Sequence, residues 1–253
     1  MKLHVHDTKP ALGKAAADQG AAAIRDALAA RGHASIIIAT GASQFDTLEH
    51  LANAPDIRWD RVTVFHLDEY AGIAITHPAS FRLYLWQRFH SRLPLPVAAF
   101  HYLDCEHNDP RDEARRVSDI IRQHNIDVAM VGIGENGHLA FNDPPADFDT
   151  EDPYIIVQLD ERCRKQQVGE GWFKSMADVP TEAISMSVRQ ILKSRFIVVS
   201  VPDERKAEAV RNSLEGPVTN EVPASILQQH DNTALHVDKP AASLLKSAAA
   251  EQA

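Results

Sequence analysis

Continuous apolar runs alternate with amphipathic or alanine-rich stretches along most of this chain. The apolar runs predict strands that are covered on both faces of a sheet, and they occupy residues 34–40, 61–67, 98–103, 127–133, 183–188, 195–201 and 234–237. The other stretches predict helices at residues 11–31, 43–53, 78–92, 109–125, 204–214, 224–229 and 241–249. Strands and helices that alternate at this spacing predict an α/β fold, with a doubly wound, mainly parallel sheet and helices on both faces.

The segment 142–182 breaks this alternation, because it has many charges and prolines and little periodicity. We interpret it as an ordered loop or lid beside a site rather than as a linker. The sequence has no internal repeat and no low-complexity tract. Residues 1–253 are therefore predicted to form a single domain.

Composition and charge narrow the choice of partners. Hydrophobic residues make up 44% and charged residues 24% of the 253 residues, which is ordinary for a soluble protein. A formal charge of −9, from 35 acidic and 26 basic residues, argues against a nucleic-acid surface but not against a small phosphorylated substrate. The absence of an apolar run of about 18 residues and of a signal-peptide pattern argues against membrane insertion or secretion. Two separated cysteines, Cys105 and Cys163, fit a reducing compartment, so we expect a cytoplasmic protein and leave homo-oligomer formation open.

Ligands of open parallel sheets bind beyond the carboxyl ends of the strands, and three such ends carry candidate chemistry. The first is TGAS, residues 40–43. Its small residues Gly41 and Ala42 allow close approach of backbone N–H groups to an anion, and the hydroxyl groups of Thr40 and Ser43 add donors. The alternative is a tight strand-to-helix turn that Ser43 caps.

The second strand end is LDEY, residues 67–70. Asp68 and Glu69 follow an apolar run, so at least one carboxylate is expected to be shielded from water. Burial raises the pKa of a carboxyl group and makes it a candidate general base. An acidic helix cap or a solvated pair of loop residues is the competing interpretation.

The third strand end is GIGENGHLAFND, residues 132–143, which contains three glycines. Glycines such as Gly137 permit positive φ angles and close backbone approach. His138 exchanges protons near neutral pH, and Asp143 is placed to orient its ring if the loop curls back. The glycine pattern does not fit a dinucleotide-binding loop. Lys206, at the start of a predicted helix, is a further phosphate-binding candidate or an ordinary solvated lysine.

The combination of ATGAS, VTVFHLDEY, SFRLYLWQRF, GIGENGHLAFNDP, AISMSV, PDERKAEAV and VPASIL resembles the glucosamine-6-phosphate deaminase family. The wider superfamily of that family includes 6-phosphogluconolactonases. The resemblance covers nearly the whole chain and implies a Rossmann-like α/β fold. It also implies conversion of an amino-sugar phosphate to a ketose phosphate and ammonia, without a metal ion or an organic cofactor.

The resemblance assigns roles to individual residues. Asp68 would move a proton from C2 toward C1 of the sugar, and His138 would open the pyranose ring. The implied catalytic set is Asp68, Glu135, Asn136, His138 and Asp143. The implied set for binding substrate and its phosphate is Thr40, Gly41, Ala42, Ser43, Glu69, Gly137 and Lys206.

The chain departs from the family pattern at two places. Relatives typically have aspartate where this chain has Asn136, and glutamate where it has Asp143; Glu135 is a neighbouring carboxylate that could substitute. The segment 160–173 differs from the usual text around a phosphate-binding arginine, for which Arg162 and Arg164 are candidates.

We therefore expect isomerising deamination of glucosamine 6-phosphate, or of a close amino-sugar phosphate, to fructose 6-phosphate and ammonia. The expected enzyme is an aldose–ketose isomerase and deaminase of the hydrolase class. The alternatives are a hydrolase of the 6-phosphogluconolactonase type and a weakly catalytic sensor of sugar phosphates. LDEY and AFNDP favour the deaminase, whereas Asn136 keeps the sensor open.

Overall fold

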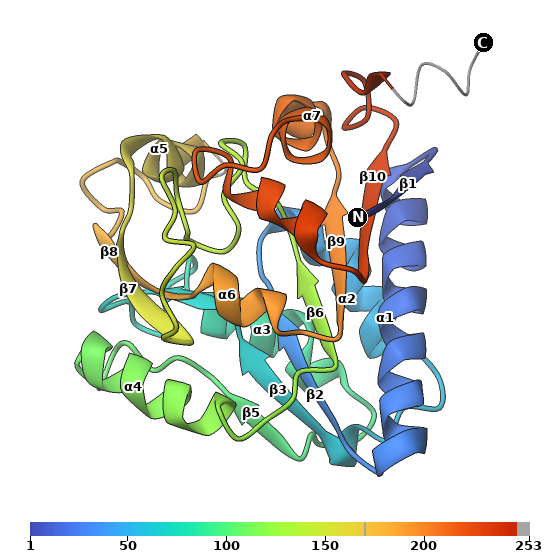
Figure 1. Cartoon of the computed structure of the whole chain (residues 1–253). Coiled ribbons are helices and arrows are strands. Elements are labelled where there is room, and N and C mark those ends of the chain that lie inside the picture. The colour runs from blue at the N-terminus through green and yellow to red at the C-terminus, as the bar shows by residue number, and fades with distance from the viewer. Residues whose placement is uncertain (170, 247–253) are drawn as a thin grey trace.

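Seven parallel strands form the main sheet (Figure 1). The computed structural model describes residues 1–169 and 171–246, without the side chains of residues 162, 163 and 166. The strands are β1 (Lys2–His6), β2 (Ala34–Ile38), β3 (Val62–His66), β5 (Ala99–His101), β6 (Val128–Val131), β9 (Phe196–Val201) and β10 (Thr233–Asp238). Their order across the sheet is β1–β10–β9–β6–β2–β3–β5, and every neighbouring pair is parallel.

Helices cover both faces of this sheet. One face packs against α1 (Lys9–Arg31), α2 (Phe45–Ala52) and α3 (Phe81–Arg88). The other packs against α4 (Pro110–Ile121), α6 (Val188–Leu192), α7 (Ala207–Glu215) and the 3₁₀ helix η5 (Pro223–Gln229). Side chains of β2 alternate between the two cores, with Ile36 and Ile38 in one and Ile37 in the other. The predicted doubly wound, mainly parallel α/β sheet is confirmed.

The connections reverse direction at the middle of the sheet. From β2 the chain proceeds through β3 to β5 at one edge, and from β6 it proceeds through β9 to β10 toward the other. The adjacent strands β2 and β6 therefore mark the topological switch point, where loops diverge to opposite faces and leave a crevice.

A second, three-stranded antiparallel sheet was not predicted. It consists of β4 (Asp68–Tyr70), β8 (Glu182–Met186) and β7 (Tyr154–Gln158), in the order β4–β8–β7. The apolar run at 183–188 is indeed a strand, but it pairs here and not in the main sheet. The segment 142–182, predicted as a loop or lid, contains β7 and the helix α5 (Glu161–Gly169).

Several helix boundaries also differ from the prediction. The predicted helix 43–53 is divided into η1 (Ala42–Gln44) and α2, the helix 204–214 begins as η4 (Glu204–Lys206), and the segment 224–229 is 3₁₀ rather than α. Further short 3₁₀ turns are η2 (Trp59–Arg61) and η3 (His90–Arg92). α3 starts at Phe81 because the Ser80 hydroxyl accepts the backbone N–H of Leu83. In the predicted closing helix, residues 241–244 form turns, and residues 247–249 lie outside the described part.

Two further findings concern bilayers and thiols. Among the described residues, no helix is both long and apolar enough to cross a membrane. Cys105 is a buried free thiol, and the side chain of Cys163 is outside the described part.

Three histidines stack along the β1–β10 pair. The ring centroids of His4 and His6 lie 4.8 Å and 5.2 Å from that of His236. His236 Nδ1 is 3.0 Å from His6 Nε2, and its Nε2 is 3.1 Å from Gln19 Oε1. Burial, aided by the two neighbouring histidines, lowers the pKa of His236 to about 3. Burial also lowers the pKa of His66, in β3, to about 3.

These two histidines make the fold sensitive to acid. Each has a lower pKa when folded than its ordinary value of 6.5, so the unfolded chain binds more protons and stability falls as pH drops below about 6.5. The expected loss is about 1.4 kcal/mol per pH unit for each histidine. Urea unfolding at about pH 7.5, 6 and 5 measures it. His236→Gln should show a shallower decline than wild type, whereas His33→Gln, at an exposed position, should not. Parallel declines for all three proteins would contradict the assignment.

Candidate active site

A pocket opens at the topological switch point. The loops after β2, β3, β6 and β9 line it, together with Phe81 at the start of α3 and with Gln167 and Trp172 from α5 and the turn after it. The predicted site residues that line it are Thr40, Gly41, Ala42, Ser43, Asp68, His138 and Lys206. The other five, which are Glu69, Glu135, Asn136, Gly137 and Asp143, are not among its lining residues.

Hydrogen bonds from neighbouring segments fix the conformation of the loop 40–43. Gly41 has a φ of 96°, which a glycine adopts readily, and its carbonyl accepts a hydrogen bond of 2.8 Å from the hydroxyl of Tyr84. The amide of Gln44 donates to Ser43 Oγ at 3.0 Å and to the Ser200 carbonyl at 3.2 Å. Because the first N–H groups of a helix lack intrahelical acceptors, the start of η1 and α2 gives this loop a positive potential suited to an anion.

The second sheet fixes the backbone on either side of Asp68. β4 pairs with β8 so that Asp68 lies opposite Ser185, and the N–H of Met186 donates to the Leu67 carbonyl at 2.9 Å. Asp68 is buried. Burial, followed by the charge of Glu69, raises the pKa of Asp68 to about 8. The pocket therefore presents a carboxyl group that is far more basic than an exposed aspartate.

Glu69 points away from the pocket and caps α3. Its side chain is fully buried. It accepts hydrogen bonds from Tyr70 N at 3.0 Å, Ser80 Oγ at 3.0 Å, Phe81 N at 3.1 Å and Arg82 N at 2.9 Å. Burial raises the pKa of Glu69 to about 7, and the four donors oppose that rise. In this structure Glu69 therefore holds the start of α3 and is not among the residues that line the pocket.

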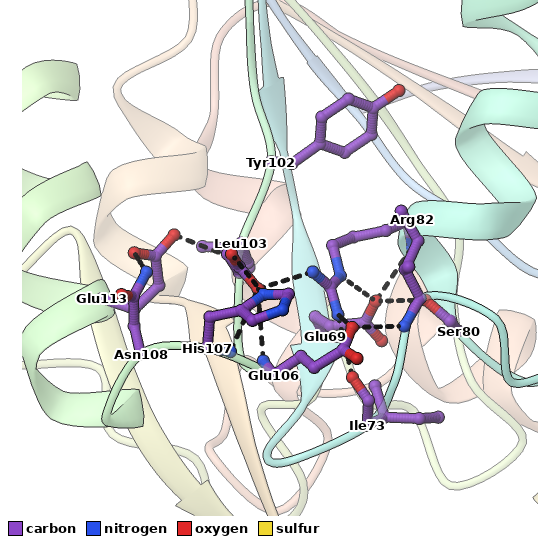
Figure 2. A network of polar contacts seen from close by, with 12 residues as sticks. Glu69, Ile73, Ser80, Arg82, Tyr102, Leu103, Glu106, His107, Asn108 and Glu113 are labelled. Atoms are coloured by element: carbon purple, nitrogen blue, oxygen red, sulfur yellow. Dashed lines mark hydrogen bonds and ion pairs between the residues drawn. The ribbon is translucent and has the colours of Figure 1, made fainter.

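Arg82 extends this arrangement toward the surface (Figure 2). Its guanidinium lies 3.7 Å from Glu69 Oε2, donates to the Ile73 carbonyl at 2.8 Å, and pairs with Asp104 at 2.6 Å and Glu106 at 3.3 Å. The guanidinium is itself buried, so these acceptors replace the water that it loses. These contacts connect α3, β4 and the loop after β5, and they hold the backbone next to Asp68 in place.

His138 stands over a glycine. A Cβ atom at Gly134 would lie 2.2 Å from His138 Nε2, so only glycine leaves room for the ring in this position. Backbone hydrogen bonds of 3.0 Å from Gly134 N to the His138 carbonyl, and from Gly137 N to the Gly134 carbonyl, close the loop. Gly137 turns it with a φ of 84°. Gly137 is therefore required for the loop conformation and does not face the pocket.

Asp143 lies beside the ring of His138. Its Oδ1 lies 3.0 Å from His138 Nδ1 and accepts a hydrogen bond of 2.9 Å from the Asn136 amide. Asp160 N donates to its Oδ2 at 3.3 Å. Burial alone would raise the pKa of Asp143, but these three contacts lower it below its ordinary value. An ionised carboxylate beside Nδ1 favours the tautomer with the proton on Nδ1, so Nε2 is left as the proton acceptor.

Asn136 joins two carboxylates through its amide. Besides its bond to Asp143, Nδ2 donates to Asp160 Oδ2 at 3.4 Å, and Oδ1 accepts the N–H of His138 at 3.1 Å. Asn136 is thus a structural link within the loop, and it lies outside the set of groups that line the pocket.

The turn between β9 and α7 supplies basic residues. Lys206 is buried and lines the pocket, next to Arg205, whose Nη1 is 3.4 Å from Glu135 Oε1. Asp203 has a φ of 82° and a ψ of 138°, a conformation that strains residues other than glycine. Its N–H donates to both oxygens of Asp238 at 3.2 Å, which holds the strained turn in place.

The structure describes the side chain of one of the two arginines that the sequence offers as phosphate-binding candidates in the segment 160–173. Arg164 donates to the carbonyls of Met176 at 2.6 Å and Val179 at 3.0 Å and is not a lining residue of the pocket. The side chain of Arg162 is outside the described part. Arg164 therefore organises the chain after α5.

The sequence reasoning missed Gly134, Arg205, Gln167, Trp172 and Phe81. Gly134 lies within the loop 132–143, and Arg205 directly precedes Lys206. The rule that ligands bind beyond the carboxyl ends of the strands could therefore have identified both residues. The other three come from α3 and the α5 segment, which the pairing of distant strands brings to the pocket. In the part of the chain that the structure describes, no group of three or more His, Cys, Asp or Glu side chains is arranged to hold a metal ion.

Comparisons with known proteins agree with this geometry. Residues 7–236 match the family model described as glucosamine-6-phosphate isomerases/6-phosphogluconolactonase. A glucosamine-6-phosphate deaminase of Exiguobacterium sibiricum is 36% identical over 223 residues, which cover 85% of this chain and 82% of the relative. A solved monomeric glucosamine-6-phosphate deaminase superposes with a TM-score of 0.87 at 30% identity, over 96% of this chain and 100% of the other.

The fold is shared more widely. The 6-phosphogluconolactonase of Thermotoga maritima superposes with a TM-score of 0.77 at 15% identity, over 94% of this chain and 99% of that one. The sequence relatives thus support the predicted deaminase and isomerase classes. The predicted hydrolase class matches only the lactonases, whose similarity to this chain is one of fold.

The Asn136 link yields a stability prediction. Asn136→Asp removes an N–H donor and places a third carboxylate against Asp143 and Asp160. We expect the free energy of unfolding to fall by about 1–3 kcal/mol at pH 8. The new carboxyl has a higher pKa folded than unfolded, so part of the loss should be regained as pH falls toward about 5.

Urea unfolding of Asn136→Asp and Asn136→Ala at both pH values provides the comparison. The alanine variant loses the donor without adding charge, so its deficit should stay nearly constant with pH. An aspartate variant with the same pH-independent deficit would show that the two neighbouring carboxylates do not act on this position.

Proposed function

The chain belongs to the glucosamine-6-phosphate isomerase/6-phosphogluconolactonase family, and from that membership we propose that it converts glucosamine 6-phosphate, or a close amino-sugar phosphate, to fructose 6-phosphate and ammonia. One observation carries the proposal. A basic buried carboxyl, a histidine with a carboxylate partner and a glycine-containing anion loop line the same pocket, in Asp68, His138 and residues 40–43.

The proposed binding step begins with the phosphate. The loop 40–43 offers hydroxyl and N–H donors at a helix start, and Lys206 adds a positive charge to the same pocket. A fixed phosphate restricts the sugar to orientations in which its other end lies near Asp68 and His138. Such positioning can supply several kcal/mol of the reduction in barrier height, on the order of the gain from making a reaction intramolecular.

His138 is the proposed group for ring opening. Opening a pyranose requires a proton to leave the C1 hydroxyl and a proton to reach the ring oxygen. With Asp143 beside Nδ1, the Nε2 atom can accept the first proton and return it to the second position. Glu135 is paired with Arg205, and Asn136 links two carboxylates, so their proposed contribution is to hold this loop and not to carry protons.

Asp68 is the proposed base for the isomerisation. Its ionised form removes the proton from C2 of the open chain while the C1 oxygen takes up a proton, and it then delivers the C2 proton to C1, which leaves an iminium at C2. A water molecule adds to C2, and the resulting carbinolamine loses ammonia to give the 2-ketone. A carboxylate whose pKa is about 8 is a much stronger base than an exposed aspartate, and that strength is what abstraction of a carbon-bound proton demands.

The direct test is incubation of the purified protein with glucosamine 6-phosphate, with ammonia and fructose 6-phosphate followed separately. We expect both products in equal amounts, and Asp68→Asn should lower turnover by at least about a hundredfold while it retains binding of the sugar phosphate. Hydrolysis of 6-phosphogluconolactone without turnover of the amino sugar would overturn the proposal. Binding without turnover of either compound would favour a sensor. Near-normal turnover of Asp68→Asn would remove Asp68 as the base.

The pH dependence of the rate offers an independent check. The base acts only when ionised, and the Asp68 pKa is raised to about 8, so kcat/KM should fall as pH drops below about 8, approaching tenfold per pH unit. Measurements between about pH 5.5 and 9.5 in buffers of constant ionic strength define this limb. A plateau that extends unchanged down to about pH 5.5 would mean that a group with an ordinary carboxyl pKa limits the reaction.

A further inference from the structure

The charges that line the pocket are unevenly distributed. Of the described lining residues, only Arg205 and Lys206 carry a permanent positive charge. Both lie in η4, between β9 and α7. The described residues that face the pocket from the α5 side are Gln167 and Trp172, which are uncharged. Arg164, on α5 itself, is directed to the carbonyls of Met176 and Val179.

A phosphate monoester carries a charge of about −1.5 to −2 near pH 7. One lysine leaves roughly half of that charge uncompensated in a partly dehydrated pocket. The loop 40–43 contributes dipoles but no cation. Asp203, the acid of this turn that lines the pocket, is paired with Lys9 at 3.3 Å.

We propose that Arg205 binds the substrate phosphate together with Lys206, so that adjacent residues of η4 provide both cations of the phosphate site. This inference rests on the proposed function for the identity of the ligand. The side chain of Arg205 lines the pocket and is 42% exposed. No charged side chain from the α5 side is required.

The contact between Arg205 and Glu135 is compatible with this role. Arg205 Nη1 contacts Glu135 at 3.4 Å, and a guanidinium with five N–H donors in a planar fork can contact more than one acceptor at a time. Glu135 belongs to the same loop as His138. The ion pair therefore orients Arg205 relative to the reacting end of the pocket, at the small energetic cost typical of a half-exposed pair.

The test measures phosphate affinity separately from turnover. Binding of glucitol 6-phosphate, an open-chain phosphate without an amine or carbonyl, and of inorganic phosphate is measured by calorimetry at low salt. Kinetics with glucosamine 6-phosphate are measured in parallel. The variants are Arg205→Gln and Arg205→Lys. Arg211→Gln is the matched control, because Arg211 is 40% exposed on α7, pairs with Glu208 and does not line the pocket.

Arg205→Gln should raise Kd for both phosphates, and KM, by about 10- to 100-fold while kcat changes less than about threefold. Arg205→Lys should recover part of the affinity, since it keeps the charge without the planar fork. Arg211→Gln should match wild type. A Kd and KM of Arg205→Gln within about twofold of wild type would overturn the inference, as would an equal loss in Arg211→Gln or no binding of glucitol 6-phosphate by wild type.

The two proposals fail in different ways. If wild type binds glucitol 6-phosphate in an Arg205-dependent manner but releases no ammonia from glucosamine 6-phosphate, the proposed reaction is wrong and the phosphate site stands. If ammonia is released at normal KM without Arg205, the reaction stands and the role of Arg205 is wrong.

Discussion

Two adjacent carboxylates, Asp68 and Glu69, are buried at the end of a parallel strand, and much of the structure serves to hold them there. Buried charges are costly unless they are paired or hydrogen-bonded. Glu69 receives three donors from α3 and its cap and one from the N–H of Tyr70, and the guanidinium of Arg82 lies 3.7 Å away. Asp68 receives no such set of donors and keeps a raised pKa. The fold thus supplies hydrogen-bond donors to Glu69, whereas the carboxyl group of Asp68 stays basic.

The second sheet explains how this asymmetry is achieved. Successive side chains of a strand point to opposite faces. Once residues 68–70 pair with β8, Asp68 must face the pocket and Glu69 must face α3. The segment 142–182 provides β7 for this sheet and α5 for the pocket wall. A region that looks like a loop in sequence therefore contains part of the sheet that orients Asp68.

Much of the fold could be predicted from the sequence, because strands buried on both faces leave continuous apolar runs. β1 escaped notice because its KLHVH pattern alternates and its histidines pack against His236. β4 has only three residues, too few for a periodic signal. The strand-end rule located residues 40–43, Asp68, His138 and Lys206 in one pocket. It did not reveal that Glu69 faces α3, because a loop was assumed where a strand imposes alternation.

The remaining site residues depend on contacts between distant segments, which no local pattern encodes. Gln167 and Trp172 reach the pocket only through α5, and the sequence gives no sign of which side of that helix faces inward. Asn136 shows the converse case. By residue type it looked like a lost catalytic acid, but its amide joins Asp143 to Asp160 and accepts the N–H of His138. An aspartate there would repel both carboxylates. In this chain, the amide of Asn136 therefore helps to lower the pKa of Asp143 beside His138.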